Sequence, residues 1–597
     1  MATGLFFSSS SATRFVNNLQ ERTNRGIVLT LVMTTLISGC LFRIAQLQLI
    51  QGQQNRQLAE QNRVRLIPIP ADRGNLLDRK GKLLAANRVS RAVYLWPRYQ
   101  TKEQWQQWAT RLGPVLNIPA AEILKKLEKA GYHSTMPVRI SQSLNPDTFT
   151  KLAEQIGELP GLEIRPESAR NYPNGDLAAH LLGYIGEATA EDLKANPDYP
   201  MGMIVGQMGL ERLLQPQLQG VWGGRLIEVD AGGKELRLLG NSPTQAGSSV
   251  KLTLDLELQK AAEKALNQRR GAVVALDVKT GAVLALASGP SFDPNIFTRR
   301  VTSKEWDRLQ GDDKPFLNRA FQGYPPGSTF KLVTAVAGLE SGKFSPDSTL
   351  ATSSYITVGG FQFHEHGSGY GVIGFREAFA VSSNTFFYQM GLSAGPEQIS
   401  KWAHRLGVGE TEVLGFEKAG YGAAPTPAQK EKLYGEPWYA GDTVSMSIGQ
   451  GLVQVTPVEM AVMYSAIANG GFRVKPHLLA SQTNTPATQP EKVGLSPSTI
   501  ATIRSGLNAV VQQGTAKQLS DGSIPPTAGK TGTAEVPGQE DNAVYVGYGP
   551  VKDPQIAIAV VVENGGFGAV SAVPIAHEMY KVYFKPSSPT KAKAKPK

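Results

Sequence analysis

The most constraining feature of this 597-residue chain is one uncharged, apolar stretch near its N-terminus, at residues 26–42. At about 1.5 Å per residue, a helix of that length spans about 26 Å, slightly less than the ~30 Å hydrocarbon core of a membrane. Ile44, Leu47 and Ile50 extend its apolar side toward the interface. No later stretch of the sequence is long and apolar enough to cross again. The sequence therefore predicts a single membrane-spanning helix that anchors one large body.

Basic residues before this stretch predict its orientation. Arg14, Arg22 and Arg25 precede it, and positive charges near a span favour the cytoplasmic side. We expect residues 1–25 in the cytoplasm, an anchor at residues 26–47 in the plasma membrane, and the remainder outside the cytoplasm. A lipoprotein signal is the alternative, because the sequence before Cys40 loosely matches a lipid-attachment box. The segment before Cys40 is longer than the ~15–30 residues of a signal peptide, which favours the uncleaved anchor.

Cysteine content and charge exclude several classes of protein. Cys40 is the single cysteine, so an intramolecular disulfide or a multi-cysteine zinc site is excluded. The net charge is +11, but almost half of it comes from the Pro/Ser/Lys-rich tail at residues 585–597, which we expect to be disordered. The rest has no basic stripe with interleaved aromatic residues, which argues against a nucleic-acid partner.

The sequence of residues 48–247 predicts a structural domain with short strands, turns and amphipathic helices. Apolar runs on either side of a polar turn predict a β-hairpin over residues 75–84. Apolar residues at helical spacing predict helices over residues 103–112 and 120–130. The stretch contains no recognisable cluster of a nucleophile with a base. We expect a pedestal domain without chemistry of its own.

Residues 248–584 carry sharper signals. An acidic start and a basic end predict a helix over residues 255–269, and a hairpin follows over residues 271–288. A second pair of apolar strands is expected over residues 545–564, and the segment between the two pairs has mostly helical patterns, including a capping box at Thr456. The sequence predicts an α+β domain in which helices flank an antiparallel sheet built from both ends of the domain.

The first chemical motif is Ser328-x-x-Lys331. Pro325, Pro326 and Gly327 precede it and predict a sharp turn into a helix. Residues three apart lie on the same helical face, so Lys331 is expected beside Ser328. A serine hydroxyl needs a base, and a lysine serves only if burial or a nearby cation lowers its pKa. The helix N-terminus adds backbone N–H groups that stabilise an oxyanion.

Two further motifs follow in order. Ser382-x-Asn384 offers a hydroxyl for proton relay and an amide for hydrogen bonding to the lysine or to a substrate. Lys530-Thr531-Gly532-Thr533 begins an expected edge strand, in which Lys530 and the two threonine hydroxyls suit a carboxylate and Gly532 leaves room for a substrate backbone.

Chance matches to these motifs are present as well. Ser248-x-x-Lys251 and Ser588-x-x-Lys591 share the Ser-x-x-Lys spacing, one before a strand and one in the tail. Lys279-Thr280-Gly281 repeats the third motif, but it precedes Ser328 and continues with an alanine. Its glycine and flanking strands predict a hairpin turn.

Taken in this order, the three motifs resemble those of the penicillin-interacting serine acyltransferases. The resemblance covers nearly the whole chain, because other segments are similar to the class B penicillin-binding proteins, namely Arg73-Gly74, Asp78-Arg79-x-Gly81, Arg170-x-Tyr172-Pro173, His180-Leu181-x-Gly183-Tyr184, Gly209-Leu210-Glu211, and Gly449-Gln450-Gly451 with Thr456-Pro457. Residues 65–69 and 562–566 are more similar to the elongation-type members, penicillin-binding protein 2, than to the division type.

This resemblance implies a D,D-transpeptidase that cross-links peptidoglycan without a cofactor and is inhibited by β-lactams. Ser328 would attack a stem peptide, Lys331 would be the base, and Lys530, Ser382 and Asn384 would assist it. Thr531, Gly532 and Thr533 would bind the donor, with the N–H groups of Ser328 and Thr533 as the oxyanion hole. The implied partners are peptidoglycan stem peptides, a SEDS-type glycosyltransferase and membrane proteins of the elongation machinery.

Three alternatives remain open within and beside this family. One is a division-type transpeptidase. Another is a β-lactam sensor, although about 25 cytoplasmic residues are few for a signalling effector. The third is a β-lactamase, which soluble export and a shorter chain would favour. The pair His364 and His366 could ligate a metal, or it could be solvated or hydrogen-bonded. Some members that resemble this chain hold zinc near the Ser-x-Asn loop with a cysteine ligand, which this sequence lacks outside the anchor.

Overall fold

The computed structural model describes residues 10–54, 56, 63–134, 136–200, 202–230, 235–409, 414–416 and 422–585. The chain divides into two compact units, one of Met1–Ile69 with Trp222–Pro243 and one of Pro70–Val221 with Thr244–Lys597. The first residues of the expected cytoplasmic segment, 1–9, and nearly all of the expected basic tail, 586–597, lie outside the described residues.

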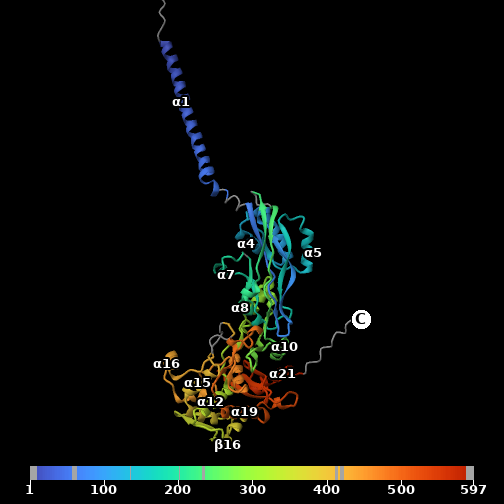
Figure 1. Ribbon diagram of the computed structural model, residues 1–597, viewed down its shortest axis with the longest axis vertical. Coiled ribbons are helices and arrows are strands. Elements are labelled where there is room, and N and C mark those ends of the chain that lie inside the picture. Colours follow the sequence, from blue (N-terminus) through green and yellow to red (C-terminus); the bar gives the residue numbers. More distant parts are fainter. Residues whose placement is uncertain are drawn as a thin grey trace, which may run out of the picture. The chain divides into compact units, whose positions relative to one another are not determined.

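The first unit contains the predicted apolar helix. Helix α1 spans Ser10–Ala45 and continues into a short π-helical turn, η1, at Gln46–Ile50 (Figure 1). Within the described residues, Asn24–Ile50 is the one helical stretch long and apolar enough to cross a membrane. Its apolar side chains are exposed, as lipid contact requires; Leu29 and Leu36 are 66% and 61% accessible. The unit also holds an antiparallel sheet in the order β1-β8-β9, at Val64–Ile69, Gly223–Val229 and Glu235–Ser242.

The N-terminal part of the second unit is a sheet with its own small core. The strands run in the order β10-β2-β3-β4, with β5 also paired to β3, at Val250–Lys251, Leu76–Leu77, Leu83–Leu95, Val138–Ser141 and Leu162–Asn171. Helices α3, α4 and α5 bury Trp105, Ile123 and Leu152 beside it, at Lys102–Leu116, Ala120–Ala130 and Pro146–Gln155. The predicted hairpin and both predicted helices are confirmed.

The scattered motifs of this region meet in one buried ion cluster. The carboxylate of Glu211, which is fully buried, accepts hydrogen bonds from Arg73 Nε at 2.6 Å and from Arg170 Nε at 2.7 Å. Tyr172 donates to the same carboxylate at 3.3 Å. Burial opposes the ionisation of Glu211, but the two guanidinium groups hold its pKa below the usual value. These motif residues therefore join three distant segments.

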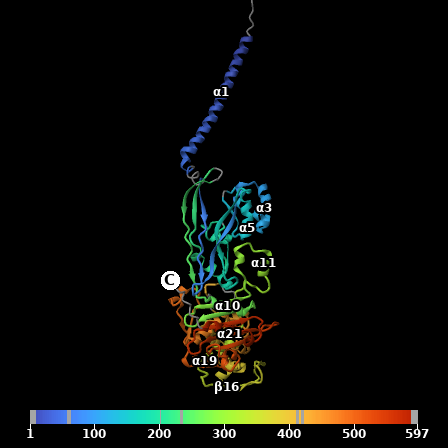
Figure 2. The same cartoon turned by 90° about the vertical axis from the view of Figure 1, so that its right-hand side faces the viewer.

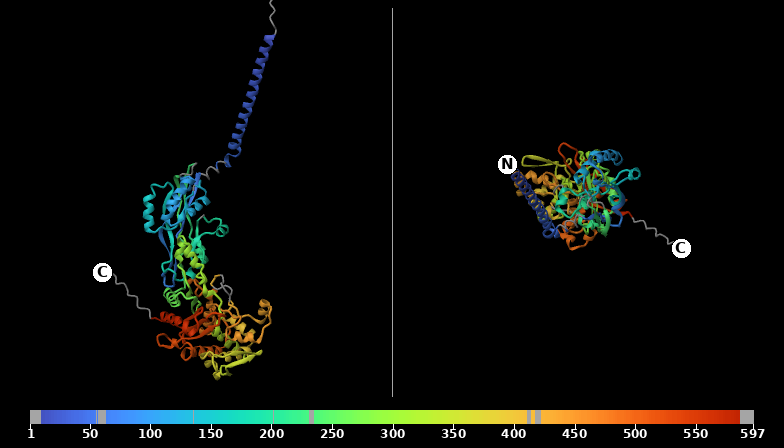
Figure 3. Two further views of the ribbon diagram at one scale, coloured as in Figure 1. Left: turned by 180° about the vertical axis from the view of Figure 1, so that it is seen from behind. Right: turned by 90° about the horizontal axis from the view of Figure 1, so that it is seen from above.

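The C-terminal part is built on a five-stranded antiparallel sheet in the order β12-β11-β21-β20-β19 (Figure 2; two further views in Figure 3). Its strands are Val283–Gly289, Gly271–Asp277, Ile556–Val562, Asn542–Gly549 and Ala528–Ala534. Both predicted strand pairs are present, and they meet where β11 pairs with β21. The predicted α+β fold, an antiparallel sheet flanked by helices and closed by both ends of the domain, is confirmed.

Helices cover both faces of this sheet, because every residue of β20 and β21 is buried although successive side chains point to opposite faces. Helices α10, at Leu256–Leu266, and α21, at Val573–Phe584, pack together against the sheet (Figure 2). Helix α18, at Pro457–Ala468, is buried along its whole length and packs on β11, β20 and β21. The predicted capping box is present, since Glu459 N donates to Thr456 Oγ1.

The other elements of the second unit are shorter. The segment expected to be mostly helical also contains two short antiparallel strand pairs between residues 349 and 374, which were not predicted from the sequence. The hairpin β14–β15 lies between β13 and β16, which pair with each other. The elements are η2 Pro97–Tyr99, α6 Ala179–Leu182, β6 Ile185–Glu187, α7 Ala190–Ala195, β7 Ile204–Gly206, α8 Gly209–Leu213, α9 Gln215–Leu218, η3 Pro294–Thr298, α11 Ser303–Leu309, η4 Arg319–Phe321, η5 Gly327–Phe330, α12 Lys331–Glu340, β13 Thr349–Thr352, β14 Tyr355–Val358, β15 Phe361–His364, β16 Gly371–Gly374, α13 Phe375–Ala380, α14 Asn384–Ala394, α15 Pro396–Arg405, α16 Pro427–Tyr434, α17 Ala440–Ser447, β17 Phe472–Arg473, η6 Ala480–Gln482, η7 Pro486–Thr488, β18 Glu491–Lys492, α19 Pro497–Gln512, η8 Lys517–Ser520 and α20 Gly568–Ser571.

Candidate active site

Ser328 lies on a tight turn that leads into a buried helix. It belongs to η5, and α12 follows directly from Lys331. Gly327 has φ +53°, and a Cβ there would lie 2.6 Å from the carbonyl oxygen of Thr533. A Cβ on Gly532 would lie 2.8 Å from the carbonyl oxygen of Pro326. The two glycines therefore allow edge strand β19 to approach the turn that presents Ser328.

Lys331 points from the start of α12 into the interior. Its side chain is fully buried, and its amine donates to the carbonyl oxygen of Ser382 and to Asn384 Oδ1, both at 2.7 Å. It lies 3.3 Å from Ser382 Oγ. These contacts link Ser-x-x-Lys directly to Ser-x-Asn, as the sequence analysis expected.

Ser382 connects the two lysines to Ser328. Its hydroxyl donates to Ser328 Oγ at 3.1 Å, and the amine of Lys530 donates to Ser382 Oγ at 2.9 Å. Ser382 has φ +60°, a conformation that costs a non-glycine residue about 1–3 kcal/mol and persists only where its surroundings hold it. In that conformation, its Oγ occupies the junction of all three motifs.

Burial determines the charge state of the two amines. Lys530 is fully buried, and burial lowers its pKa to about 7. Burial also lowers the pKa of Lys331 well below its ordinary value, and the charge of Lys530 lowers it further, whereas Glu365 acts in the opposite direction. Among the described residues, neither amine forms an ion pair with a carboxylate. A neutral amine is therefore accessible at physiological pH, as a lysine base requires.

A cleft of about 660 Å³ opens beside these groups and is lined by Ser328, Asn384, Thr531 and Thr533 among others. Gln450 Nε2 lies 3.5 Å from the carbonyl oxygen of Thr533. The N–H and the carbonyl of one strand residue point to the same side, so the N–H of Thr533 also faces away from β20, toward the turn. All eight residues predicted for the site are thus in one place, Ser328, Lys331, Ser382, Asn384, Lys530, Thr531, Gly532 and Thr533.

Two residues of the site were missed by sequence reasoning. Thr515, which follows α19, shares a 2.6 Å hydrogen bond with the hydroxyl of Thr531. Glu365, just after β15, is buried and accepts hydrogen bonds from the Ser-x-Asn segment. No local pattern in the sequence identifies Thr515. Glu365 stands between His364 and His366, which were considered as metal ligands, so its own role was not predicted.

The geometry around Glu365 does not fit a metal site. Five hydrogen-bond donors already occupy its carboxylate. The Ser-x-Asn segment offers no cysteine ligand, because the residue between Ser382 and Asn384 is a serine. Within the described residues, no group of three or more metal-type ligands exists, and both His364 and His366 are exposed.

The chance matches lie elsewhere. Lys279 occupies an exposed turn between β11 and β12, as predicted, and its amine pairs with Asp553 at 2.8 Å. Lys251 is exposed on β10, three residues after Ser248. Ser588 and Lys591 are outside the described residues.

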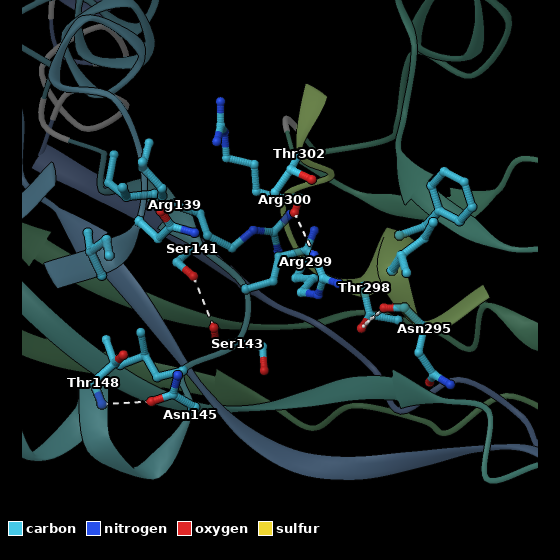
Figure 4. A pocket seen from close by; sticks show the side chains of 18 of the residues that line it. Arg139, Ser141, Ser143, Asn145, Thr148, Asn295, Thr298, Arg299, Arg300 and Thr302 are labelled. Carbon is cyan, nitrogen blue, oxygen red and sulfur yellow. Dashed lines mark hydrogen bonds between the residues drawn. The ribbon is translucent and has the colours of Figure 1, made fainter. Parts of the chain in front are cut away.

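A second cavity is larger than the cleft that holds these motifs. A cavity of about 860 Å³ lies where α4 and β4 face η3, and Figure 4 shows Arg139, Arg299 and Arg300 around it. Two of its arginines form ion pairs, Arg300 with Glu122 at 2.9 Å and Arg299 with Glu305 at 2.6 Å. The described residues that line it contain no buried amine beside a hydroxyl, so it lacks the chemistry of the smaller cleft.

Comparisons with known proteins agree with this geometry. The penicillin-binding protein transpeptidase domain matches residues 271–581, and the penicillin-binding protein dimerisation domain matches residues 68–252. The chain is 32% identical over 590 residues to the peptidoglycan D,D-transpeptidase MrdA of Acinetobacter baumannii, covering 93% of this chain and 87% of that protein.

Two solved structures are similar to this chain over most of its length. A complex of penicillin-binding protein 2 with MreC from Helicobacter pylori matches with a TM-score of 0.77 and 28% identity, covering 87% of this chain and 98% of that one. A second solved structure is described as "Structural coordination of polymerization and crosslinking by a peptidoglycan synthase complex". One of its chains matches with a TM-score of 0.70 and 33% identity, and the match covers 96% of this chain and 100% of that one.

Proposed function

The chain belongs to the class B penicillin-binding proteins and is a peptidoglycan D,D-transpeptidase of the elongation type, and on that premise we propose that it works through an acyl-enzyme on Ser328. The observation that carries the proposal is the pair of fully buried lysines that meet at Ser382, whose hydroxyl donates to Ser328.

In the first step, Ser328 Oγ attacks the carbonyl carbon of the penultimate D-Ala of a donor stem peptide. The neutral amine of Lys331 accepts the serine proton, directly or through Ser382, whose hydroxyl contacts both groups. The proton then passes to the departing amine, the C–N bond breaks, and terminal D-Ala leaves. The backbone N–H groups of Ser328 and Thr533 stabilise the oxyanion.

In the second step, an amine of a neighbouring stem attacks the ester carbon. Lys331 accepts the proton of that amine, the ester bond breaks, and Ser328 recovers its proton as the new amide forms. Lys530 supports both steps because its charge disfavours protonation of Lys331. Asn384 orients the Lys331 amine, to which it is bonded.

The donor carboxylate has a matching surface on β19. Thr531 and Thr533 line the cleft on the same strand, two residues apart and thus on one face. Their hydroxyls can donate to a carboxylate, and Gly532 leaves the strand edge open. β-Lactams present the same carboxylate and a strained amide, so they are expected to acylate Ser328.

The direct test uses the full-length protein in detergent, with a donor peptide that ends in D-Ala-D-Ala and an amine acceptor. Mass spectrometry should show D-Ala release together with a cross-linked peptide, and Ser328→Ala should give neither product. Release of D-Ala by water alone, without cross-links at high acceptor concentration, would contradict transpeptidation. Cross-linking by Ser328→Ala would contradict the acyl-enzyme.

The location and partners of the chain are proposed from α1 and from the two structures above. We place residues 1–25 in the cytoplasm, the anchor at 26–47 in the bacterial plasma membrane, the pedestal domain at 48–247 and the transpeptidase domain at 248–584 outside the cytoplasm. A SEDS-type glycosyltransferase and elongation proteins comparable to MreC are the expected partners. Co-purification from membranes with and without residues 1–47 tests the contribution of the anchor.

A further inference from the structure

Glu365 is a buried carboxylate that the reaction steps above do not use. It follows β15 and is 8% exposed, and its backbone N–H is tied to the carbonyl oxygen of Ser354 at 2.9 Å. It lies on a different segment from the three motifs, 18 residues before Ser383. A buried carboxylate is costly unless it is hydrogen-bonded, so its surroundings are informative.

Five donors converge on this carboxylate. Oε1 accepts from the N–H of Asn384 at 2.7 Å and from that of His366 at 2.9 Å. Oε2 accepts from Ser383 Oγ at 2.6 Å and from both the N–H and the hydroxyl of Thr385, at 3.0 and 2.9 Å. Four of the five donors belong to three consecutive residues, which begin immediately after Ser382.

The four donors from residues 383–385 form the start of helix α14. Ser383 is its N-cap, and Asn384 and Thr385 are its first two residues, whose N–H groups lack partners within the helix. A carboxylate at this position satisfies those groups and interacts favourably with the helix dipole. Burial opposes the ionisation of Glu365, but the bonds from Ser383 and from the N–H groups of Asn384 and Thr385 keep its pKa below the usual value.

The same helix start presents two groups of the active site. Ser382 and Asn384 flank Ser383, and both accept hydrogen bonds from the amine of Lys331. Ser382 is in the left-handed conformation, which must be held by its neighbours. Glu365 therefore fixes the residues on which the position of the catalytic amine depends.

We propose that Glu365 is a positioning residue, whose carboxylate locks the start of α14 so that Ser382 and Asn384 hold the Lys331 amine beside Ser328. The proposal rests on the proposed function, because it concerns the same acylation step. It assigns the rigidity of the Ser-x-Asn segment to a hydrogen-bonded carboxylate and not to a metal ion.

The test compares Glu365→Gln with a matched control in the full-length protein. Glu459 is also a buried carboxylate at a helix start, where it accepts from Thr456 N, Thr456 Oγ1 and Gly409 N, but it lies outside the cleft. Acylation by a fluorescent penicillin is resolved into the dissociation constant of the initial complex and the first-order acylation rate constant. Thermal unfolding is recorded for both variants.

Glu365→Gln should lower the acylation rate constant by about 10- to 100-fold with little change in the dissociation constant, as expected for misplaced catalytic groups. Glu459→Gln should lose thermal stability but keep its acylation rate. Glu365→Asp, which keeps the charge, should recover part of the rate. Equal rates for Glu365→Gln and the wild type would overturn the proposal.

A double-mutant cycle separates positioning from a general structural role. If Glu365 acts through Asn384, the combined Glu365→Gln and Asn384→Ala change should reduce the rate by clearly less than the product of the two single effects. A full product would contradict the proposal. Loss of acylation on chelator treatment, restored by zinc, would also overturn it. If the wild type itself does not label at Ser328, the proposed function fails instead.

Discussion

Two Lys-Thr-Gly segments stand at opposite edges of one sheet and have opposite properties. Lys279-Thr280-Gly281 follows β11 and leads into edge strand β12, whereas Lys530-Thr531-Gly532 lies within edge strand β19. The Lys279 side chain is 59% exposed and pairs with Asp553 at 2.8 Å, which raises its pKa. Lys530 is fully buried and its amine donates to Ser382. Among the described residues it has no carboxylate partner, and burial lowers its pKa to about 7.

The comparison shows that identical residues gain different chemistry from their surroundings. A solvated lysine with a carboxylate partner stays protonated and serves as a surface charge. A lysine that is desolvated beside a second lysine is driven toward the neutral form that a base requires. Four predictions test whether the buried edge alone is catalytic, from the largest expected effect to the smallest.

The nucleophile should show the largest effect. Ser328→Ala removes the hydroxyl that Ser382 contacts at the buried edge, so labelling by a fluorescent penicillin should disappear while the thermal unfolding midpoint is retained. Ser248→Ala changes the other described Ser-x-x-Lys match, and it should label like the wild type. Persistent labelling of Ser328→Ala would show that the wrong serine has been assigned.

The base should show the next largest effect. Lys331→Ala removes the amine that bonds Ser382 and Asn384, and loss of a general base reduces rates by about 10²- to 10⁴-fold. The acylation rate constant, measured by rapid mixing with the fluorescent penicillin, tests this directly. A rate within twofold of the wild type would exclude Lys331 as the base.

The pH dependence should respond to Lys530 and not to its counterpart. The charge of Lys530 lowers the pKa of Lys331, so Lys530→Met should raise that pKa. Because only neutral Lys331 accepts a proton, acylation is lost as the pH falls through this pKa, and the loss in the variant should begin at a higher pH. An unchanged acid limb would contradict the electrostatic role of Lys530.

The smallest effect is expected at the exposed segment. Lys279→Met removes one partner of a solvated ion pair with Asp553, a class of interaction that contributes little. Its acylation rate and acid limb should match the wild type, and its thermal unfolding midpoint should hardly move. A large loss of acylation would mean that the two Lys-Thr-Gly segments have been assigned the wrong way round.

Much of the fold and of the catalytic set could be predicted from sequence because local patterns carry it. Turn residues before Ser328, helical spacing over α4 and the strand pairs of the sheet all act within a few residues. Motif order then selected Lys530 over Lys279. The predicted apolar helix and the α+β class follow from the same kind of local signal.

The remainder depends on contacts between distant segments. Glu365 meets Ser383 only because the loop after β15 folds over the start of α14, and Thr515 meets Thr531 across the edge of the sheet. No spacing rule connects such pairs. The ion cluster of Glu211 with Arg73 and Arg170 is similar, since its members were visible as separate motifs but their convergence was not. The short strand pairs between residues 349 and 374 were likewise hidden among helical patterns.

The central claim is that one serine at the buried edge of the sheet becomes covalently acylated. Intact-mass spectrometry of the full-length protein after penicillin treatment, followed by peptide mapping, tests it most directly. The account predicts a mass increase of one penicillin per chain, located on the peptide that contains Ser328. An adduct on any other peptide, or no adduct on folded protein, would contradict it.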